Sequence, residues 1–232
     1  MAAEEIAQNI QHIRARIEQA AFRVGREADS ITLVAVTKTV EAAQIAAAYE
    51  AGIRDFGENY IQEAQTKIGQ PPLILPDLRW HFIGHLQTNK AKEVVRRFVL
   101  VQSVDSLRLA QEIGKQALKT GQPVEILLEV MLDPGSGKYG CKPEKTLEMA
   151  QQIEECPGVL LRGLMGIAPY TPAPEAARPA FKQLYQLYTQ LSPECRHTLS
   201  MGMTGDFEVA IEEGATMVRL GTALFGKRPP QA

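Results

Sequence analysis

The chain has 232 residues, of which 45% are hydrophobic and 22% charged, the composition of a packed globular protein. Its length fits one α/β barrel of about 250 residues or two smaller domains. Lysine and arginine number 25 against 27 aspartate and glutamate, so the formal net charge is −2. This balance excludes the basic field that non-specific nucleic-acid binding needs and gives no polybasic membrane surface.

The N-terminus and the cysteines indicate a soluble, cytoplasmic protein. The chain begins Met1-Ala-Ala-Glu-Glu, acidic where a signal peptide would be basic. No stretch approaches the ~18 consecutive apolar residues of a membrane helix. The three cysteines, Cys141, Cys156 and Cys195, follow neither a disulfide nor a CxxC zinc pattern. We therefore expect reduced thiols in a reducing compartment.

The first predicted elements are an amphipathic helix and a buried strand. Apolar residues recur at helical spacing on one face near the N-terminus: Ile6, Ile10, Ile13, Ile17 and Val24. Residues 31–37, Ile-Thr-Leu-Val-Ala-Val-Thr, are β-branched and apolar on both faces, which is typical of strands in parallel sheets. Lys38 ends this strand, and an alanine-rich helix is predicted over 41–51.

The strand–helix unit then repeats along the chain. Short apolar segments end near Phe56, Ile83, Val101, Met131, Met165, Leu199 and Leu220. Helical stretches between them include 106–120, 144–154, 175–191 and 206–213. Eight units predict a single (β/α)8 TIM barrel over 1–232, with an extra N-terminal helix within 1–28, no second β-domain and a frayed tail over 227–232. A doubly wound open sheet is the alternative, although its GxGxxG signal is absent after the first strand.

Lys38 is the first candidate functional residue, because the loops after the strands build the active face of such barrels. It shares strand parity with Val34 and Val36. Burial lowers the pKa of a lysine and makes its amine a nucleophile for carbonyl groups. The alternative is an ordinary ion-paired lysine at the mouth of a strand.

Two loops near the C-terminus favour a phosphate site. Residues 200–206, Ser-Met-Gly-Met-Thr-Gly-Asp, combine glycines and hydroxyls before a helix, and residues 219–222, Arg-Leu-Gly-Thr, repeat the pattern. Barrels commonly hold phosphate on the backbone N–H groups after strands seven and eight. Arg219 shares parity with Gly221 and would place a cation in the barrel mouth.

A lysine that traps aldehydes and a phosphate cradle together describe one ligand with an aldehyde and a phosphate on a flat ring. Pyridoxal 5′-phosphate (PLP) fits, while spacing alone also permits a phosphosugar aldolase or isomerase. His81 and His85 lie four residues apart, which spans roughly 13 Å on a strand, so we expect no metal site.

Six motifs in order resemble those of the pyridoxal phosphate homeostasis protein family (YggS/PROSC type). They are 34–38 Val-Ala-Val-Thr-Lys, 56–60 Phe-Gly-Glu-Asn-Tyr, 80–90 Trp-His-Phe-Ile-Gly-His-Leu-Gln-Thr-Asn-Lys, 164–167 Leu-Met-Gly-Ile, 199–203 Leu-Ser-Met-Gly-Met and 218–222 Val-Arg-Leu-Gly-Thr. The match runs from the first strand almost to the C-terminus. The resemblance implies the barrel of the alanine racemase N-terminal domain without its second domain.

The resemblance also implies roles for matching residues and assigns none as catalytic. Lys38 would carry PLP as an internal aldimine, and Arg219 would face the pyridine nitrogen. The phosphate would be held by Ser200, Gly202, Gly221 and Thr222, and the ring would be lined by Asn59 and Met165. One departure is Met131, which stands where the family often has asparagine, and Lys138 in the following loop becomes an extra candidate for ligand contact.

The implied function is intracellular PLP homeostasis, by binding, buffering or delivering PLP, with indirect effects on amino-acid and keto-acid metabolism. The expected partners are PLP and PLP-dependent apo-enzymes, and the expected state is a monomer. One alternative is a PLP-dependent amino-acid racemase, but racemisation needs acid–base groups on both faces of the substrate carbon. Racemases also carry a Tyr-Gly-His-Gly-like stretch where this chain has 39–42 Thr-Val-Glu-Ala. A second alternative is an interaction protein that senses PLP.

Overall fold

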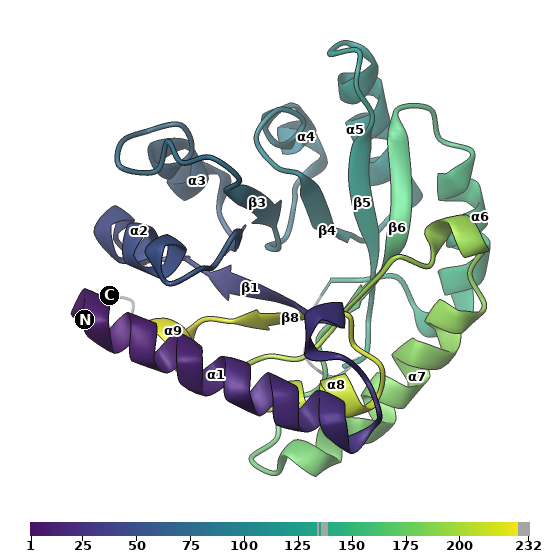
Figure 1. Ribbon diagram of the computed structural model, residues 1–232. Coiled ribbons are helices and arrows are strands. Elements are labelled where there is room, and N and C mark those ends of the chain that lie inside the picture. The colour runs from purple at the N-terminus through teal and green to yellow at the C-terminus, as the bar shows by residue number, and fades with distance from the viewer. Residues whose placement is uncertain (134, 136–138, 227–232) are drawn as a thin grey trace.

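The computed structural model describes residues 1–133, 135 and 139–226. Eight parallel strands close into a barrel in chain order, with β1 paired to β8 (Figure 1). The strands are β1 Thr32–Val36, β2 Asp55–Glu58, β3 Arg79–Phe82, β4 Leu100–Val104, β5 Val124–Val130, β6 Val159–Gly166, β7 Thr198–Ser200 and β8 Met217–Leu220. The predicted (β/α)8 barrel is therefore confirmed, and the open doubly wound sheet is excluded.

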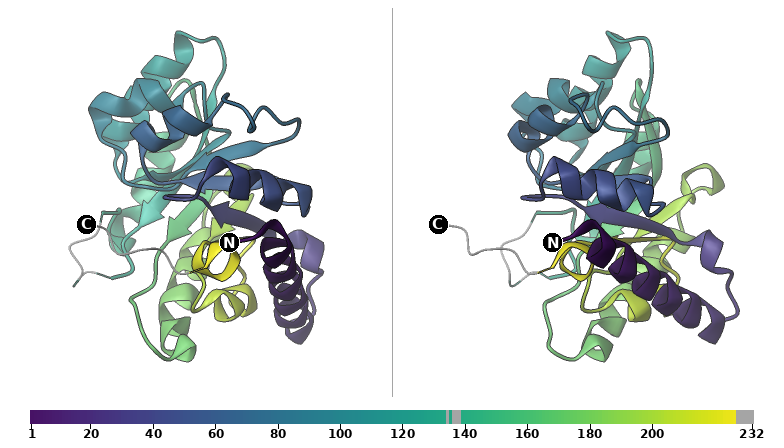
Figure 2. Two further views of the ribbon diagram at one scale, coloured as in Figure 1. Left: turned by 90° about the vertical axis from the view of Figure 1, so that its left-hand side faces the viewer. Right: turned by 60° about the vertical axis from the view of Figure 1, so that its left-hand side comes forward.

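Helices follow the strands on the outside of the barrel (Figures 1 and 2). They are α2 Ala42–Glu50, α3 Ile61–Lys67, α4 Ala91–Val94, α5 Leu107–Leu118, α6 Thr146–Glu154, α7 Arg178–Thr189, α8 Phe207–Glu212 and α9 Thr222–Phe225. Each helical stretch named from the sequence contains one of them. Short 3-10 turns precede several helices and shorten them relative to the predicted ranges.

The apolar core has two layers, because successive strand residues point to opposite faces. The outer layer fills the space between strands and helices, with Phe56 and Phe181 fully buried in it. The inner layer lies inside the barrel and contains Val34, Leu100, Leu127, Met165 and Met217. Burial of each large apolar side chain contributes about 1.5–3 kcal/mol, so these layers supply most of the driving force for folding.

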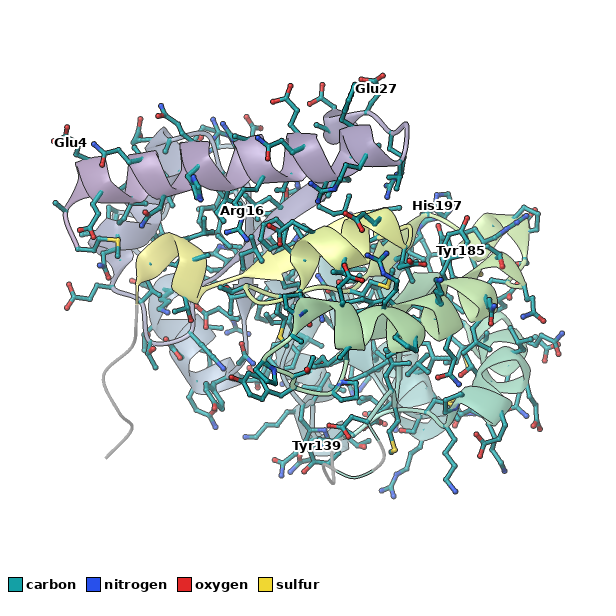
Figure 3. All side chains as sticks on the ribbon, turned by 90° about the horizontal axis from the view of Figure 1, so that it is seen from below. Glu4, Arg16, Glu27, Tyr139, Tyr185 and His197 are labelled. Atoms are coloured by element: carbon teal, nitrogen blue, oxygen red, sulfur yellow. The ribbon has the colours of Figure 1, made fainter. Side chains whose placement is uncertain are left out.

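The additional helix α1 (Ala3–Arg23) packs against α2, α8 and α9 on the outside of the barrel (Figure 1). Its predicted isoleucine stripe is buried, but Val24 lies beyond the last turn and is 40% exposed, so the stripe ends earlier than predicted. Arg16 lies on the side of α1 that faces the rest of the molecule (Figure 3). It pairs with Glu208 of α8 at 2.5 Å and lies over the Phe207 ring. Arg23 pairs with Glu212 at 2.7 Å. These contacts fix α1 to the helix that follows β7.

Several sequence expectations concern what surrounds the barrel. The three cysteines are buried and form no disulfide, as expected. Within the described ranges, no helix combines the length and hydropathy needed to cross a bilayer. The predicted tail, 227–232, and Lys138 lie outside the described residues.

Candidate functional site at the carboxyl ends of the strands

A cavity of 250 Å³ opens at the carboxyl ends of β1, β6, β7 and β8. Among the sequence-predicted residues it brings together Lys38, Arg219, Gly221 and Thr222. The remaining lining comes from Val36 and from the loops after β6 and β7: Ala168, Tyr170, Thr171, Met203, Thr204, Gly205 and Asp206. The parity arguments for Lys38 with Val36 and for Arg219 with Gly221 are confirmed, since both pairs face this cavity. The cavity therefore combines a primary amine, a guanidinium and a loop of hydroxyls and glycines.

The backbone on either side of Lys38 is held by a buried ion cluster from α3. Lys67 at the end of α3 donates from Nζ to the carbonyl oxygen of Thr37 at 2.7 Å, and to carboxylate oxygens of Glu58 and Glu63 at 2.8 and 2.6 Å. The Thr37 hydroxyl donates to Glu58 at 2.6 Å, and Glu63 accepts the N–H of Thr39 at 2.5 Å. Both neighbours of Lys38 are thus tied to one cluster.

Thr39 adopts a left-handed backbone conformation with a φ of 60°. A β-branched residue rarely occupies this region, and strained backbone of this kind costs of order 1–3 kcal/mol. The hydrogen bond from Thr39 N–H to Glu63 compensates part of this cost. The left-handed conformation of Thr39 ends the extended backbone directly after Lys38. The Lys38 residue therefore lies at the cavity, at the point where the strand direction is lost.

The loop after β7 is shaped to receive an anion. Gly202 has a φ of 94°, and a Cβ there would lie 2.6 Å from the Ala210 Cβ, so only glycine fits. Asp206 Oδ1 accepts the N–H of Met203 at 2.6 Å and closes the turn. Within the described chain, the N–H groups of Thr204 and Gly205 donate to no carbonyl or side chain. Thr204 and Gly205 are lining residues of the cavity, where an anion would satisfy such donors.

Arg219 projects from β8 into the barrel and is 4% exposed. Its Nη1 donates to the hydroxyl of Ser200 at 2.5 Å and its Nη2 to the carbonyl oxygen of Gly166 at 3.0 Å. Burial lowers the pKa of Arg219 to about 10, while the nearby charges of Glu129 and Asp206 raise it. The guanidinium is therefore cationic at neutral pH, in a fixed position, and able only to donate hydrogen bonds.

Glu129 is a buried carboxyl group close to Arg219. It lies on the same face of β5 as Leu127 and points into the barrel, opposite Met165 in the register of β5 and β6. Burial raises the pKa of Glu129 to about 7; the charge of Arg219 lowers it, and that of Asp105 raises it. The carboxyl group consequently changes charge near neutral pH.

The other sequence-predicted residues lie around the cavity rather than in its lining. Ser200 and Met165 are buried inside the barrel beneath it, and the Gly202 carbonyl accepts the backbone N–H of Arg219 at 3.0 Å. Asn59 lines a neighbouring cavity of 390 Å³ with His85, and its Oδ1 is buried with no partner in the described chain. Their roles toward a ligand stay predictions.

Sequence reasoning missed part of the lining. Thr204 stands inside the loop singled out from sequence, and its position just before a helix could have identified it. Tyr170 and Thr171 follow β6, where no sequence pattern marks a ligand contact. Lys67 and Glu58 belong to the cluster behind Lys38 and carry no motif that signals their pairing.

The described part of the chain contains no group of three or more His, Cys, Asp or Glu side chains arranged to hold a metal ion. His81 faces the barrel interior and is hydrogen-bonded to Asp55 at 2.9 Å. His85 stacks on the ring of Tyr139 outside the barrel interior. The two histidines thus belong to separate environments.

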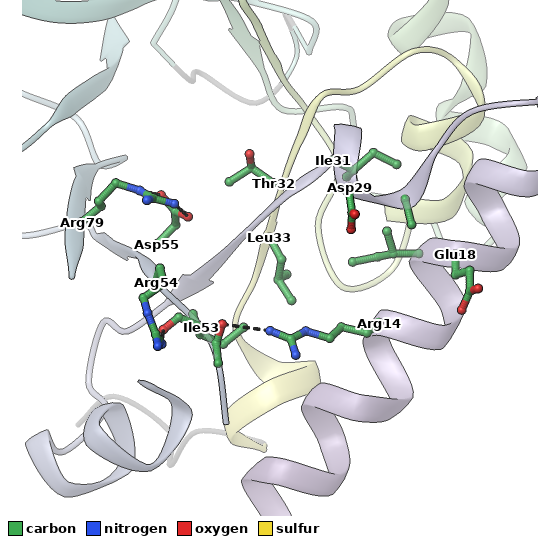
Figure 4. Close-up of a pocket in the computed structure, with 13 residues that line it drawn as sticks. Arg14, Glu18, Asp29, Ile31, Thr32, Leu33, Ile53, Arg54, Asp55 and Arg79 are labelled. Carbon is green, nitrogen blue, oxygen red and sulfur yellow. Dashed lines mark hydrogen bonds and ion pairs between the residues drawn. The ribbon is translucent and has the colours of Figure 1, made fainter. Parts of the chain in front are cut away.

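Larger cavities lie away from the strand carboxyl ends. One of 610 Å³ opens at the amino ends of β1–β3, between α1 and the barrel, and is lined by Arg14, Asp29, Arg54 and Arg79 among others (Figure 4). There Arg14 donates to the Gly52 carbonyl oxygen at 2.9 Å. Another of 620 Å³ lies between the end of α4 and the start of β5. We place the functional site in the smaller cavity because active sites of these barrels form at the carboxyl ends of the strands.

The fold and the site define a barrel of the alanine racemase type, and the family model "Alanine racemase, N-terminal domain" matches residues 3–229. Within that class, the chain belongs to the pyridoxal phosphate homeostasis protein family. It is 44% identical over 223 residues to the pyridoxal phosphate homeostasis protein of Pseudomonas aeruginosa, covering 96% of both chains. It is 40% identical over 231 residues to that of Escherichia coli K12, covering 97% of both.

A solved structure also resembles this chain in both sequence and fold. PipY of Synechococcus elongatus PCC7942, solved with PLP bound, is 37% identical and superposes with a TM-score of 0.83. The superposition covers 95% of this chain and 100% of PipY. The fold class and the family expected from the motifs are therefore confirmed.

Proposed function

We propose that this protein binds PLP through Lys38 and serves PLP homeostasis by holding, buffering and delivering it. One observation carries the proposal: Lys38, Arg219 and the hydroxyl- and glycine-rich loops meet at a single cavity. Thr204 and Gly205 line the same cavity, and their N–H groups, which have no acceptor within the described chain, fit a phosphate. Membership of a family whose relatives are named for pyridoxal phosphate homeostasis supports the same conclusion.

Three sets of residues contact three parts of PLP: its aldehyde, its phosphate and its ring nitrogen. Lys38 meets the aldehyde, and when PLP is bound its aldehyde carbon forms a C=N bond to the lysine with loss of one water. The phosphate is held by Thr204, Gly205, Gly221 and Thr222 through hydroxyls and N–H groups, with Gly202 allowing the loop its close approach. Arg219 donates to the ring nitrogen. Each charge-assisted bond contributes about 1.5–3 kcal/mol, so the phosphate end retains the ligand while its covalent bond stays exchangeable.

Arg219 also favours holding over turnover. A guanidinium donates a hydrogen bond but gives up no proton at neutral pH, so the ring nitrogen facing it stays unprotonated. An unprotonated ring is a weaker electron sink, which disfavours the carbanion chemistry of PLP enzymes. We therefore propose a carrier that affects amino-acid and keto-acid metabolism indirectly, through the PLP-dependent apo-enzymes that receive PLP from it.

The proposal is tested by trapping PLP on the protein. Incubation with PLP followed by borohydride reduction is expected to add one pyridoxyl phosphate to the intact mass, mapped to Lys38. Lys38→Ala should lack this adduct. Lys182→Ala removes an exposed lysine of α7 and should keep it, which controls for modification of surface amines. A wild-type protein that gains no adduct, or gains it equally in Lys38→Ala, would refute PLP binding at this site.

The cellular setting proposed for the protein is a monomer in the cytoplasm, with residues 1–232 acting as one domain. Buried, unpaired cysteines fit a reducing compartment. Among the described residues, the exposed large apolar side chains Phe22, Ile74 and Tyr170 lie far apart in the sequence and on separate segments, which favours a monomer. Sedimentation equilibrium of the purified protein checks the monomer, and a dimer at micromolar concentration would contradict it.

A further inference from the structure

A buried chain of hydrogen bonds crosses the barrel interior and ends on Arg219. The Ser200 hydroxyl accepts a hydrogen bond from Arg219 and donates one to Gln102 Oε1 at 2.6 Å. Gln102 Nε2 lies 3.1 Å from His81 Nδ1. His81 Nε2 lies 2.9 Å from Asp55 Oδ1. Five strands thus contribute one residue each to a single hydrogen-bonded path through the barrel interior.

The two ends of the path, together with the orientation of the Gln102 amide, give each hydrogen bond a direction. Arg219 can only donate, so the Ser200 oxygen accepts from it and the Ser200 proton points to Gln102 Oε1. Gln102 then presents its amide N–H to His81 Nδ1, which leaves the His81 proton on Nε2, directed at Asp55.

Asp55 is the matching acceptor at the far end. Burial raises the pKa of its carboxyl group, but hydrogen bonds from His81 and Arg79 outweigh this and lower it below its usual value. Asp55 is therefore a carboxylate and accepts only. An obligate donor at one end and an obligate acceptor at the other are consistent with this arrangement of protons between them.

The surroundings make this arrangement rigid. Ser200 and Gln102 are 0% exposed, and neither has a side-chain N or O atom that lacks a partner. Leu127, Met165 and Met217 fill the interior around them, so water cannot replace a lost bond. A polar network that is buried and fully satisfied resists rotation of any member.

We propose that Ser200 and Gln102 are positioning residues that hold the Arg219 guanidinium in register with the cofactor ring, with His81 and Asp55 fixing the orientation of Gln102. The inference rests on the proposed function and deepens it. The Ser200 hydroxyl donates its proton to Gln102 and accepts from Arg219. Ser200 therefore acts on the ligand through Arg219 rather than by donating to the phosphate.

Ser200→Ala and Gln102→Met test the proposal with two readouts, the dissociation constant for PLP and the absorbance spectrum of the bound form. Ser200→Ala leaves Arg219 anchored on the Gly166 carbonyl oxygen alone, whereas Gln102→Met leaves Arg219 bonded to a Ser200 hydroxyl that has lost its acceptor. We expect Lys38 still to take up PLP, with an affinity about tenfold weaker and a shifted long-wavelength absorbance band. Gln102→Met keeps the length of the side chain and supplies a second test should Ser200→Ala fail to fold.

Ser103→Ala is the matched control. Ser103 is also a buried serine in the barrel wall, and its hydroxyl donates to the Gly84 carbonyl oxygen at 2.5 Å. It has no contact with Arg219 among the hydrogen bonds of the described chain. Its removal should lower the melting temperature as Ser200→Ala does, yet leave PLP affinity and spectrum unchanged.

A double-variant cycle separates positioning from general destabilisation. If Ser200 acts through Arg219, adding Ser200→Ala to Arg219→Leu should weaken PLP binding no further than Arg219→Leu alone. Additive losses, or a wild-type affinity and spectrum in both Ser200→Ala and Gln102→Met, would overturn the inference. Failure of the proposed function is distinguishable, because the wild-type protein itself would then gain no pyridoxyl adduct.

Discussion

Replacing Lys67 by methionine is expected to destabilise the protein by about 3–5 kcal/mol, the range seen when one partner of a buried ion pair is removed. Glu58 is 0% exposed and its Oε1 accepts from Lys67 at 2.8 Å. Burial already raises the pKa of Glu58, and Lys67 is the main group that lowers it. Without that ammonium, Glu58 has to take up a proton or remain an uncompensated buried charge. Urea denaturation at neutral pH measures the loss of unfolding free energy.

The same substitution should also disturb the site, because Lys67 holds the carbonyl oxygen of Thr37 next to Lys38. We expect slower and incomplete formation of the pyridoxyl adduct on Lys38, even at temperatures where the variant is folded. A fall in stability without any change in adduct formation would show that the cluster supports the fold alone.

Two further variants control for this first prediction. The double variant Lys67→Met/Glu58→Gln removes both charges and should recover a substantial part of the lost stability. Arg97→Met breaks a partly exposed pair with Glu93, 3.2 Å apart on the surface, and should change stability by less than about 1 kcal/mol. If Lys67→Met were as mild as Arg97→Met, the buried cluster would not be a stabilising element.

Glu129→Gln is expected to remove a pH dependence of stability. The pKa of Glu129 is raised from 4.5 to about 7 in the folded protein, so between these values the folded state holds a proton that the unfolded state has lost. Wild-type stability therefore falls as pH rises through this window, by up to about 3 kcal/mol from this group. The variant should match the wild type near pH 5 and exceed it near pH 8, as measured by denaturation of PLP-free protein at both pH values.

Glu125→Gln provides the comparison for this second prediction. Glu125 lies on the same strand but is half exposed and pairs with Arg162 at 2.9 Å, so its replacement should shift stability by less than about 1 kcal/mol. Its difference from wild type should not grow between pH 5 and pH 8 as that of Glu129→Gln does. Parallel stability curves for wild type and Glu129→Gln would contradict the raised pKa of Glu129.

Much of the fold could be predicted because the barrel repeats a local pattern. The strand ends marked by Lys38 and Leu220 follow from short apolar runs, and their shared edge follows from parallel strands. Lys38, Arg219, Gly221 and Thr222 lie at or just beyond the carboxyl ends of β1 and β8, and all four line the same cavity. Val24 was misplaced because helical spacing does not reveal where the last turn ends.

The contacts that support the site could not be found from sequence for a physical reason. Gln102 and Ser200 are 98 residues apart and meet only because the barrel closes. Lys67 and Glu58 are nine residues apart, on α3 and β2, and look like ordinary surface charges in the sequence. Asn59 follows the last residue of β2 and lines a neighbouring cavity, a placement that no motif encodes. Pairings of this kind depend on tertiary distance, which spacing along the chain does not give.

The attachment of α1 to α8 has a consequence for how the chain is made. The ion pair between Arg16 and Glu208 joins residues 192 positions apart, and α9 covers the same helix from the far end of the chain. At translation rates of about 5–20 residues per second, those residues leave the ribosome roughly ten to forty seconds after α1. Throughout that interval the helices that bury part of the isoleucine stripe of α1 have not yet been synthesised. The nascent chain therefore exposes an apolar helix face to chaperones and to other nascent chains on the same messenger RNA.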